Sequence, residues 1–151
     1  MSGDAASAGK VEFHHGVGDK LAYACRLLRK AHRAGARVVV TGDDATLRTL
    51  DRQLWTFDEQ EFLPHVLAAQ PADVPARQHD TAIWLTPDAA SALGERGVLV
   101  NVGQEMPRGM ARYARVFDIV SSEPEDRQLG RQRWKQYAAL GWQVQPHEVK
   151  E

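Results

Sequence analysis

Apolar and polar positions along this chain follow two alternating periods, which predict strands and helices in turn. Short runs of β-branched and other apolar residues suit strands that are buried on both faces. These runs lie at residues 37–41, 81–85, 97–102 and 115–120. Residues 11–15 alternate enough for another strand, and residues 142–147 fit a last strand at a sheet edge.

Three stretches repeat apolar residues at the spacing of a helix face. The first follows Asp19, which stands at an N-cap position, and ends before Gly35. The second follows Asp43, and the third extends from Glu123 to about Leu140. A strand–helix–strand–helix opening is typical of a right-handed βαβ unit and therefore of a mainly parallel sheet.

The order of these elements predicts the fold class. We expect a three-layer α/β fold in which helices flank a mainly parallel sheet, with a Rossmann-like topology but no nucleotide site. Residues 57–64 and 70–79 are expected to be loops, and residues 87–93 at most a short helix. The length of 151 residues suits a single domain over residues 10–148, after a flexible N-terminus over residues 1–9.

Charge and cysteine content exclude several kinds of protein. The 19 lysines and arginines nearly balance the 20 acidic residues, so a net charge of −1 supplies no overall attraction for nucleic acid or an anionic membrane. Any basic site must therefore be local. The single cysteine, Cys25, excludes an internal disulfide and fits a buried, unreactive thiol. No apolar run approaches the roughly 20 residues of a membrane helix. The polar start does not resemble a secretory signal, so we expect a cytoplasmic protein.

The usual cofactor motifs do not fit this chain. Residues 16–21 begin like a dinucleotide-binding loop, but Leu21 stands where a third small residue is required, and no GK[ST] turn follows. Asp43 and Asp44 could hold a magnesium ion, although helix capping and the helix dipole account for both. His14 and His15 would point to opposite faces of a strand, so they cannot share a zinc ion.

Other catalytic groups are also missing from the sequence. The remaining histidines are scattered without a pair at i, i+4, and we expect them to be surface or capping side chains: His32, His65, His79 and His147. No G-x-S-x-G elbow is present. We therefore expect no metal, no cofactor and no catalytic residues.

The third predicted helix carries a local basic patch. Cations and an indole share one side of it, at the edge of the face that Leu129, Tyr137 and Leu140 are expected to bury. We call this patch the basic strip; it consists of Arg127, Arg131, Trp134 and Lys135. Arg133 falls on the core side, where it is expected to snorkel or to pair with an acid. The strip suits a ligand that joins a carboxylate to an apolar group. A solvated helix face and a stacking platform for single-stranded nucleic acid are the alternatives.

A second apolar group follows the second predicted helix. It combines Leu54, Trp55, Phe57, Phe62, Leu63 and Pro64, and acids flank it at Asp58, Glu59 and Glu61. If exposed, such a group indicates a protein partner. The same residues could instead fold back as core lining, and the pattern leaves both possibilities open.

Three stretches of the sequence together resemble a known family. They are Ala34–Val40; Leu50-Asp51-x-x-Leu54-Trp55 with Phe62-Leu63-Pro64-His65-x-Leu67-Ala68; and Arg131-x-Arg133-Trp134-Lys135-x-Tyr137 with Gly141-Trp142. In this order and spacing they resemble the chi subunit of the bacterial DNA polymerase III holoenzyme, a part of its clamp-loader assembly. The resemblance spans about residues 11 to 144.

The resemblance implies a non-catalytic α/β subunit with two protein partners. One is the acidic, Phe-ended C-terminal tail of single-stranded DNA-binding protein, and the other is the psi subunit. The tail-binding positions match Arg127, Arg131 and Lys135, with Trp134 where the family commonly has Tyr. The terminal carboxylate of the tail is expected to pair with Arg131, and its ring to pack near Trp134 and Val144.

The partner-docking positions match Trp55 and Phe62, and we add the neighbouring Pro64. DNA would be reached only indirectly. The longer polar N-terminus and the acidic loop over residues 58–61 depart from the family pattern. Two other classes of function stay open: an enzyme with an α/β nucleotide site, and a protein that binds single-stranded DNA directly.

Overall fold

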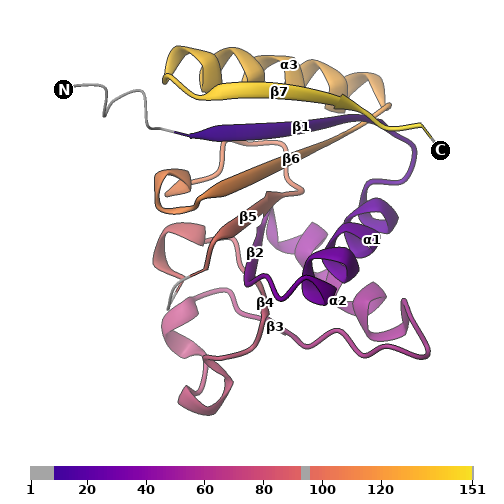
Figure 1. Cartoon of the computed structure of the whole chain (residues 1–151), viewed down its shortest axis with the longest axis vertical. Helices are drawn as coiled ribbons and strands as arrows, with labels where there is room; N and C mark the ends of the chain where they lie inside the picture. Colours follow the sequence, from indigo (N-terminus) through magenta and orange to yellow (C-terminus); the bar gives the residue numbers. More distant parts are fainter. Residues whose placement is uncertain (1–8, 93–95, 151) are drawn as a thin grey trace.

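A computed structural model describes residues 9–92 and 96–150 and shows a seven-stranded sheet in which all neighbouring strands are parallel (Figure 1). The strand order across the sheet is β3-β4-β2-β5-β6-β1-β7. The strands are β1 (Lys10–Val17), β2 (Val38–Thr41), β3 (His65–Leu67), β4 (Ile83–Leu85), β5 (Val98–Asn101), β6 (Arg115–Ser121) and β7 (Gln143–Glu148). The prediction of a mainly parallel sheet is confirmed.

Helices cover both faces of this sheet. They are α1 (Lys20–Arg33), α2 (Asp44–Thr56) and α3 (Pro124–Ala139), with short 3₁₀ helices at Pro71–Asp73, Ala76–Gln78, Ala89–Ser91 and Met110–Arg112. Along β2, Val38 and Val40 pack in the cluster of α1 and α2, whereas Val39 packs in the cluster that includes Tyr137 of α3. A strand with apolar residues on both faces therefore joins two cores, as its continuous β-branched run predicts. The three-layer α/β fold is confirmed.

Two aspartates begin the first two helices as predicted. The Asp19 carboxylate accepts a hydrogen bond from the Ala22 backbone N–H at 3.0 Å. The Asp43 carboxylate accepts from the Thr46 N–H at 3.1 Å and from its hydroxyl at 2.7 Å, and these bonds hold the pKa of Asp43 below its usual value. Asp44 pairs with Arg48 one turn later at 3.0 Å. Capping and local pairing thus account for the acids at this strand end.

The prediction missed one strand and shortened another. β3 is three residues long and only half-buried at the sheet edge, so it carries no periodic signal. β1 continues to Val17, two residues past the predicted end, and leads directly into Asp19. The segments predicted as loops hold two of the one-turn 3₁₀ helices. The N-terminal segment predicted to be flexible lies outside the described residues, except for Gly9.

β7 forms the sheet edge beside β1. The Gln143 and Val149 N–H groups donate to carbonyls of Gly9 and His15, so odd-numbered residues of β7 direct their backbone groups toward β1. The even-numbered Pro146 therefore turns its missing donor away from the sheet, where no ladder bond is lost. A proline at this position also discourages a further strand from pairing. No helix in the described ranges is long and apolar enough to span a membrane.

Candidate protein-binding surfaces

Helix α3 contacts the sheet through a face that is mostly polar. The residues it buries are Asp126, Gly130, Arg133 and Tyr137. Leu129 is only half-buried, and Leu140 is 62% exposed, so the prediction that Leu140 lies in the core is wrong. Gly130 brings the helix close to the sheet, because an added Cβ would lie 2.9 Å from a methyl of Val120. The orientation of the helix therefore follows polar contacts rather than its leucines.

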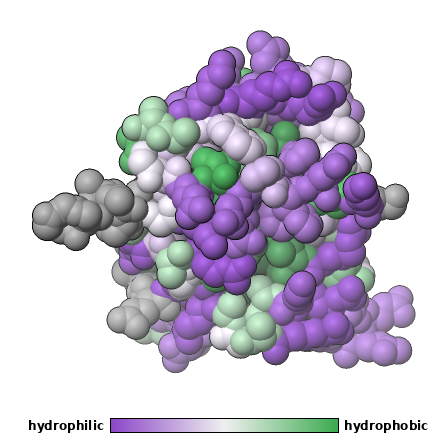
Figure 2. Space-filling view, turned by 45° about the horizontal axis from the view of Figure 1, so that its top comes forward, coloured by the Kyte–Doolittle hydropathy of each residue, from purple (hydrophilic) through white to green (hydrophobic). Residues whose placement is uncertain are grey.

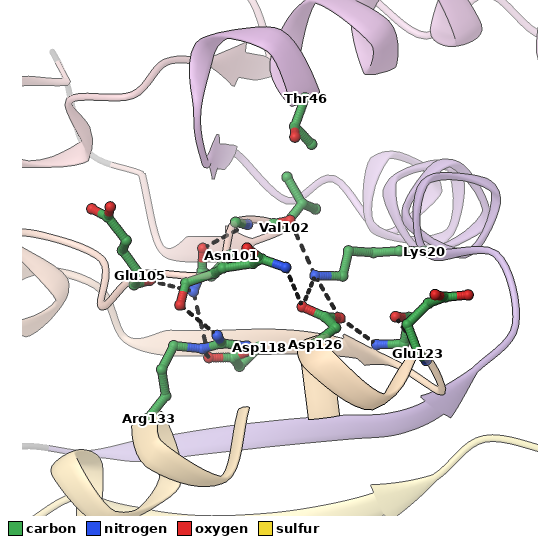
Figure 3. A network of polar contacts seen from close by, with 12 residues as sticks. Lys20, Thr46, Asn101, Val102, Glu105, Asp118, Glu123, Asp126 and Arg133 are labelled. Carbon is green, nitrogen blue, oxygen red and sulfur yellow. Dashed lines mark hydrogen bonds and ion pairs between the residues drawn. The ribbon is translucent and has the colours of Figure 1, made fainter. Parts of the chain in front are cut away.

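Arg133 donates three of the hydrogen bonds that join α3 to the rest of the protein (Figure 3). It is 1% exposed, and its Nε and Nη2 donate to the two oxygens of Asp118 at 2.8 and 2.9 Å. Its Nη1 donates to the Gln104 carbonyl at 2.7 Å. Burial alone would lower the pKa of Arg133, but the hydrogen bonds and charge of Asp118 raise it. The predicted pairing with an acid is confirmed, whereas snorkelling to solvent is wrong.

Tyr137 shares the same carboxylate. Its hydroxyl donates to Asp118 Oδ2 at 2.5 Å, and burial together with the Asp118 charge raises the pKa of Tyr137. Asp118 lies in the middle of the buried strand β6 and is fully buried. Asp118 belongs to no motif or helical pattern in the sequence. Its only signal there is one acid within an apolar run, which requires a buried partner of opposite charge.

The basic strip points away from these buried contacts. The Arg127, Arg131 and Lys135 side chains are exposed, and none of them pairs with a carboxylate among the residues that the structure describes. Trp134 is half-buried and meets the Phe13 ring edge-on, with the centroids 5.0 Å apart. The upper part of the molecule, over α3 and β7, is largely hydrophilic (Figure 2). The structure therefore brings three free cations and an indole to one helix surface.

Val144 lies on β7, near the strip. It is half-buried and packs against the same apolar cluster as Tyr137 and Trp142. Val144 pairs in register with Val11 of β1, two residues before Phe13. Its side chain therefore stands on the face of the sheet that α3 covers.

The second predicted surface is exposed in part. Trp55 is 57% and Phe62 62% exposed, and their rings lie 5.7 Å apart. We call these two residues the aromatic pair. Leu54 and Leu63 are buried in the core, and Pro64 is half-buried. The group is thus divided: Trp55 and Phe62 are exposed, and Leu54 and Leu63 line the core.

The acidic loop beside the aromatic pair is tied to α1. Asp58 accepts hydrogen bonds from the Gln60 and Glu61 N–H groups, and it pairs with Arg29 at 3.1 Å; these contacts hold its pKa below the usual value. Glu61 pairs with Arg33 at 2.6 Å. Two of the acids that depart from the family pattern therefore fasten the loop to the neighbouring helix.

A cleft of about 1160 Å³ lies at the carboxyl ends of the strands, where α/β proteins bind nucleotides. Six acidic residues line it, Asp43, Asp88, Glu105, Glu123, Glu125 and Asp126, against two basic ones, Lys20 and Arg108. Lys20 is itself engaged, by Asp126 at 2.9 Å and by the Val102 carbonyl at 3.3 Å. A surplus of carboxylates repels phosphate, so the cleft disfavours the nucleotide-enzyme alternative.

The histidines are placed differently from one another. His14 contacts Tyr23 of α1. The His15 ring lies 6.4 Å from the Phe13 ring, on the face that α3 covers, which confirms that the two histidines point to opposite faces. The side chain of His65 is fully buried, and its Nδ1 donates a 2.7 Å hydrogen bond to the Leu63 carbonyl, so its assignment as a surface residue is wrong. No group of three or more metal-binding side chains occurs within the described part of the chain.

His14 gives a pH-dependent prediction. Burial and the nearby His147 lower the pKa of His14 to about 4 from 6.5, so the unfolded chain takes up a proton at a higher pH than the folded chain does. As far as it depends on His14, the free energy of unfolding is therefore highest above about pH 7. It falls by about 2 kcal/mol as the pH drops from 6.5 toward 4. Urea unfolding at several pH values measures it. The loss in this window should shrink in His14→Gln and persist in His32→Gln; equal losses in both variants would refute the assignment.

A family model for the DNA polymerase III chi subunit, HolC, matches residues 9–145. The chain belongs to this family. DNA polymerase III subunit chi of Pseudomonas aeruginosa is 33% identical over 136 residues, which are 86% of this chain and 87% of that protein. The subunit chi of Haemophilus influenzae is 28% identical over 127 residues, 83% and 85% of the two chains, and that of Escherichia coli is 23% identical over 121 residues, 80% and 79%. The resemblance first seen in three short stretches is confirmed.

In this chi-family chain the three stretches occupy different parts of the fold. The first joins the end of α1 to β2, the second joins α2 to β3, and the third extends from α3 to the residue before β7. The basic strip belongs to α3, and the aromatic pair belongs to α2 and the loop before β3. The two candidate surfaces therefore rest on separate elements, and one can be changed without touching the other.

Proposed function

We propose that this chi-family chain is a non-catalytic accessory subunit that links single-stranded DNA-binding protein to the replicase. In this proposal the basic strip binds the acidic, Phe-ended C-terminal tail of that protein. The observation that carries it is the set of exposed cations on α3 that pair with no carboxylate within residues 9–92 and 96–150, with a half-buried indole among them. A charge-neutral protein with one such strip suits an acidic peptide better than a long nucleic acid, because a nucleic acid needs a wider basic surface.

The spacing of the strip suggests how the tail is held. Arg127, Arg131 and Lys135 follow one another at four-residue intervals, so they stand in a row along one side of the helix. The guanidinium of Arg131, in the middle, binds the terminal carboxylate through two parallel hydrogen bonds. Arg127 and Lys135 attract the acids that precede it. The terminal ring packs between Trp134 and the region of Val144, where the neighbouring apolar surface excludes water.

A peptide titration tests this proposal. Arg127 and Lys135 are exposed, so each of their ion pairs contributes only about 0.2–1 kcal/mol, whereas the two parallel hydrogen bonds of Arg131 and the buried ring contribute more. We therefore expect a dissociation constant in the micromolar range that rises with salt. A peptide with the tail sequence is titrated by calorimetry, beside the same peptide without its terminal Phe. Loss of the ring and displacement of the carboxylate should weaken binding roughly tenfold or more. Equal binding of both peptides would exclude this mode.

We further propose that the aromatic pair docks a second replicase protein of the psi type, with Pro64 at the edge of the contact. Two large exposed rings in contact are typical of the centre of a protein interface. The loop that carries Phe62 is held to α1 by two ion pairs, so the pair is already arranged before binding. Preorganisation of this kind reduces the entropy lost on association.

Alanine variants test the docking surface. Trp55→Ala and Phe62→Ala should each abolish co-purification with a clamp-loader protein, since truncating a central interface aromatic costs about 2 kcal/mol or more. Leu140→Ala is the matched control, because Leu140 is as exposed as Phe62 but lies at the end of α3. Retained co-purification in both aromatic variants would argue against this surface. All of these variants should bind the tail peptide normally.

A further inference from the structure

Helix α3 packs against the sheet through a mostly polar face, which is unusual for a helix in an α/β fold. Such a helix normally presents an apolar stripe to the core, and apolar contact tolerates small rotations because it is not directional. The face that α3 buries holds Asp126, Gly130, Arg133 and Tyr137 instead. Three of these four residues have polar side-chain groups that need partners in defined directions.

One carboxylate on β6 supplies most of these partners. Asp118 accepts from Arg133 at 2.8 and 2.9 Å, from the Tyr137 hydroxyl at 2.5 Å and from the Asn101 amide at 3.4 Å. The third donor of Arg133 reaches the Gln104 carbonyl at 2.7 Å. Figure 3 shows Arg133 pointing from α3 to Asp118 and to the segment that follows β5. The last two turns of the helix are thus held both to β6 and to the segment that follows β5.

The first turn of α3 is held separately. Asp126 accepts from the Ser121 N–H at 2.7 Å and pairs with Lys20 of α1 at 2.9 Å (Figure 3). Between the two anchors, Gly130 stands against Val120 with no room for a methyl group. Anchors at both ends and a close contact in the middle determine both the rotation of the helix and its position along the sheet.

Only one rotation of α3 satisfies these groups. A turn of the helix in either direction would leave the Arg133 and Asp118 charges buried and unpaired, which is strongly unfavourable. Arg131 and Lys135 lie two residues before and after Arg133, so they stand on the opposite side of the helix. The direction in which the basic strip faces is therefore tied to the direction of the buried pair.

We propose that Arg133 and Asp118 act as a positioning pair, with Tyr137 as its third member, and that they set the rotation at which α3 presents the basic strip to an acidic peptide. The pair touches no ligand itself. It places Trp134 against Phe13 and leaves Arg131 free beside it. This inference rests on the proposed function for the identity of the peptide, but the orientation of the helix can be measured without it.

The test replaces the polar group by apolar side chains of similar size. The variant Asp118→Leu, Arg133→Met, Tyr137→Phe leaves no charge at this site, and exchanges of this kind often preserve or raise stability. Its melting temperature, its affinity for the tail peptide and the nuclear Overhauser contacts between the Trp134 and Phe13 rings are compared with those of the parent chain and of Arg131→Ala. We expect a folded protein with roughly fivefold weaker tail binding and with weakened ring contacts, since apolar packing alone permits rotation.

The outcomes separate the two proposals. A folded apolar variant with parent-like affinity and ring contacts would overturn the positioning role, even if Arg131→Ala loses binding. If the parent chain does not bind the peptide, the proposed function fails, and the ring contacts alone decide the positioning role. If the apolar variant does not fold, Tyr137→Phe decides, because it removes one hydrogen bond and leaves the ion pair. We expect it to weaken tail binding about twofold and to shift the Trp134 indole resonance; an unchanged affinity and resonance would overturn the proposal.

Discussion

Arg131→Ala is expected to weaken binding of the acidic tail peptide roughly tenfold or more while leaving the fold intact. The guanidinium is exposed and has no partner among the described residues, so its removal leaves no unsatisfied group in the protein. In the complex it would make two charge-assisted hydrogen bonds to the terminal carboxylate, which together contribute about 1.5–3 kcal/mol. By the usual conversion, 1.4 kcal/mol corresponds to about a tenfold change in affinity.

Two further variants sharpen this measurement. Arg131→Lys keeps the charge but loses the planar fork, so its affinity should fall between those of the parent chain and Arg131→Ala. Gln132→Ala changes the next exposed residue, which points away from the row of cations, and should bind as the parent chain does. Calorimetry at two salt concentrations measures all three. An Arg131→Ala variant that binds like the parent chain would remove the basis for the tail-binding proposal.

Arg133→Ala is expected to lower the free energy of unfolding by about 3–5 kcal/mol. The variant leaves Asp118 fully buried without its ion-pair partner, and removal of one member of a buried pair is far more harmful than removal of an exposed one. Because small domains are stable by only about 5–15 kcal/mol, the loss would bring this protein close to unfolding at moderate temperature.

Urea unfolding of Arg133→Ala and Arg127→Ala makes the comparison direct. Both variants shorten an arginine of α3, but Arg127 is exposed, so its change should alter the free energy of unfolding by no more than about 0.5 kcal/mol. A loss below about 1 kcal/mol in Arg133→Ala would show that the buried pair does not stabilise the fold. Asp118→Ala should resemble Arg133→Ala, since it leaves the opposite charge unpaired.

Most of the fold followed from local features of the sequence. Runs of β-branched and other apolar residues marked β2, β4, β5 and β6, because a strand covered on both faces is apolar along most of its length. Asp19 and Asp43 marked the starts of two helices, because the first turn of a helix needs acceptors for its free N–H groups. β3 could not be recognised in this way. It is an edge strand of three residues, and β4 is its one strand partner among the described residues.

The sequence predicted which residues belong to the two candidate surfaces, but not which of their neighbours are exposed and which are buried. Helical spacing placed Arg127, Arg131 and Lys135 in one row, and the structure leaves all three exposed. The same spacing placed Leu140 in the core, where it does not lie. For the second surface, the sequence could not show that Phe62 is exposed and Leu63 is buried. Both residues lie in a loop after α2, and a loop has no regular repeat of buried and exposed positions.

The sequence by itself determined the α/β class, the caps and the row of cations, since each of these depends on neighbours within a few residues along the chain. The tertiary structure decided which side of α3 meets the sheet. A helix with charged and apolar residues on adjoining sides can be seated in more than one way, and its own periodicity does not choose between them. The choice depends on Asp118, which β6 places under Arg133 from 15 residues away in the sequence. Burying that arginine against the carboxylate set the direction of the basic strip.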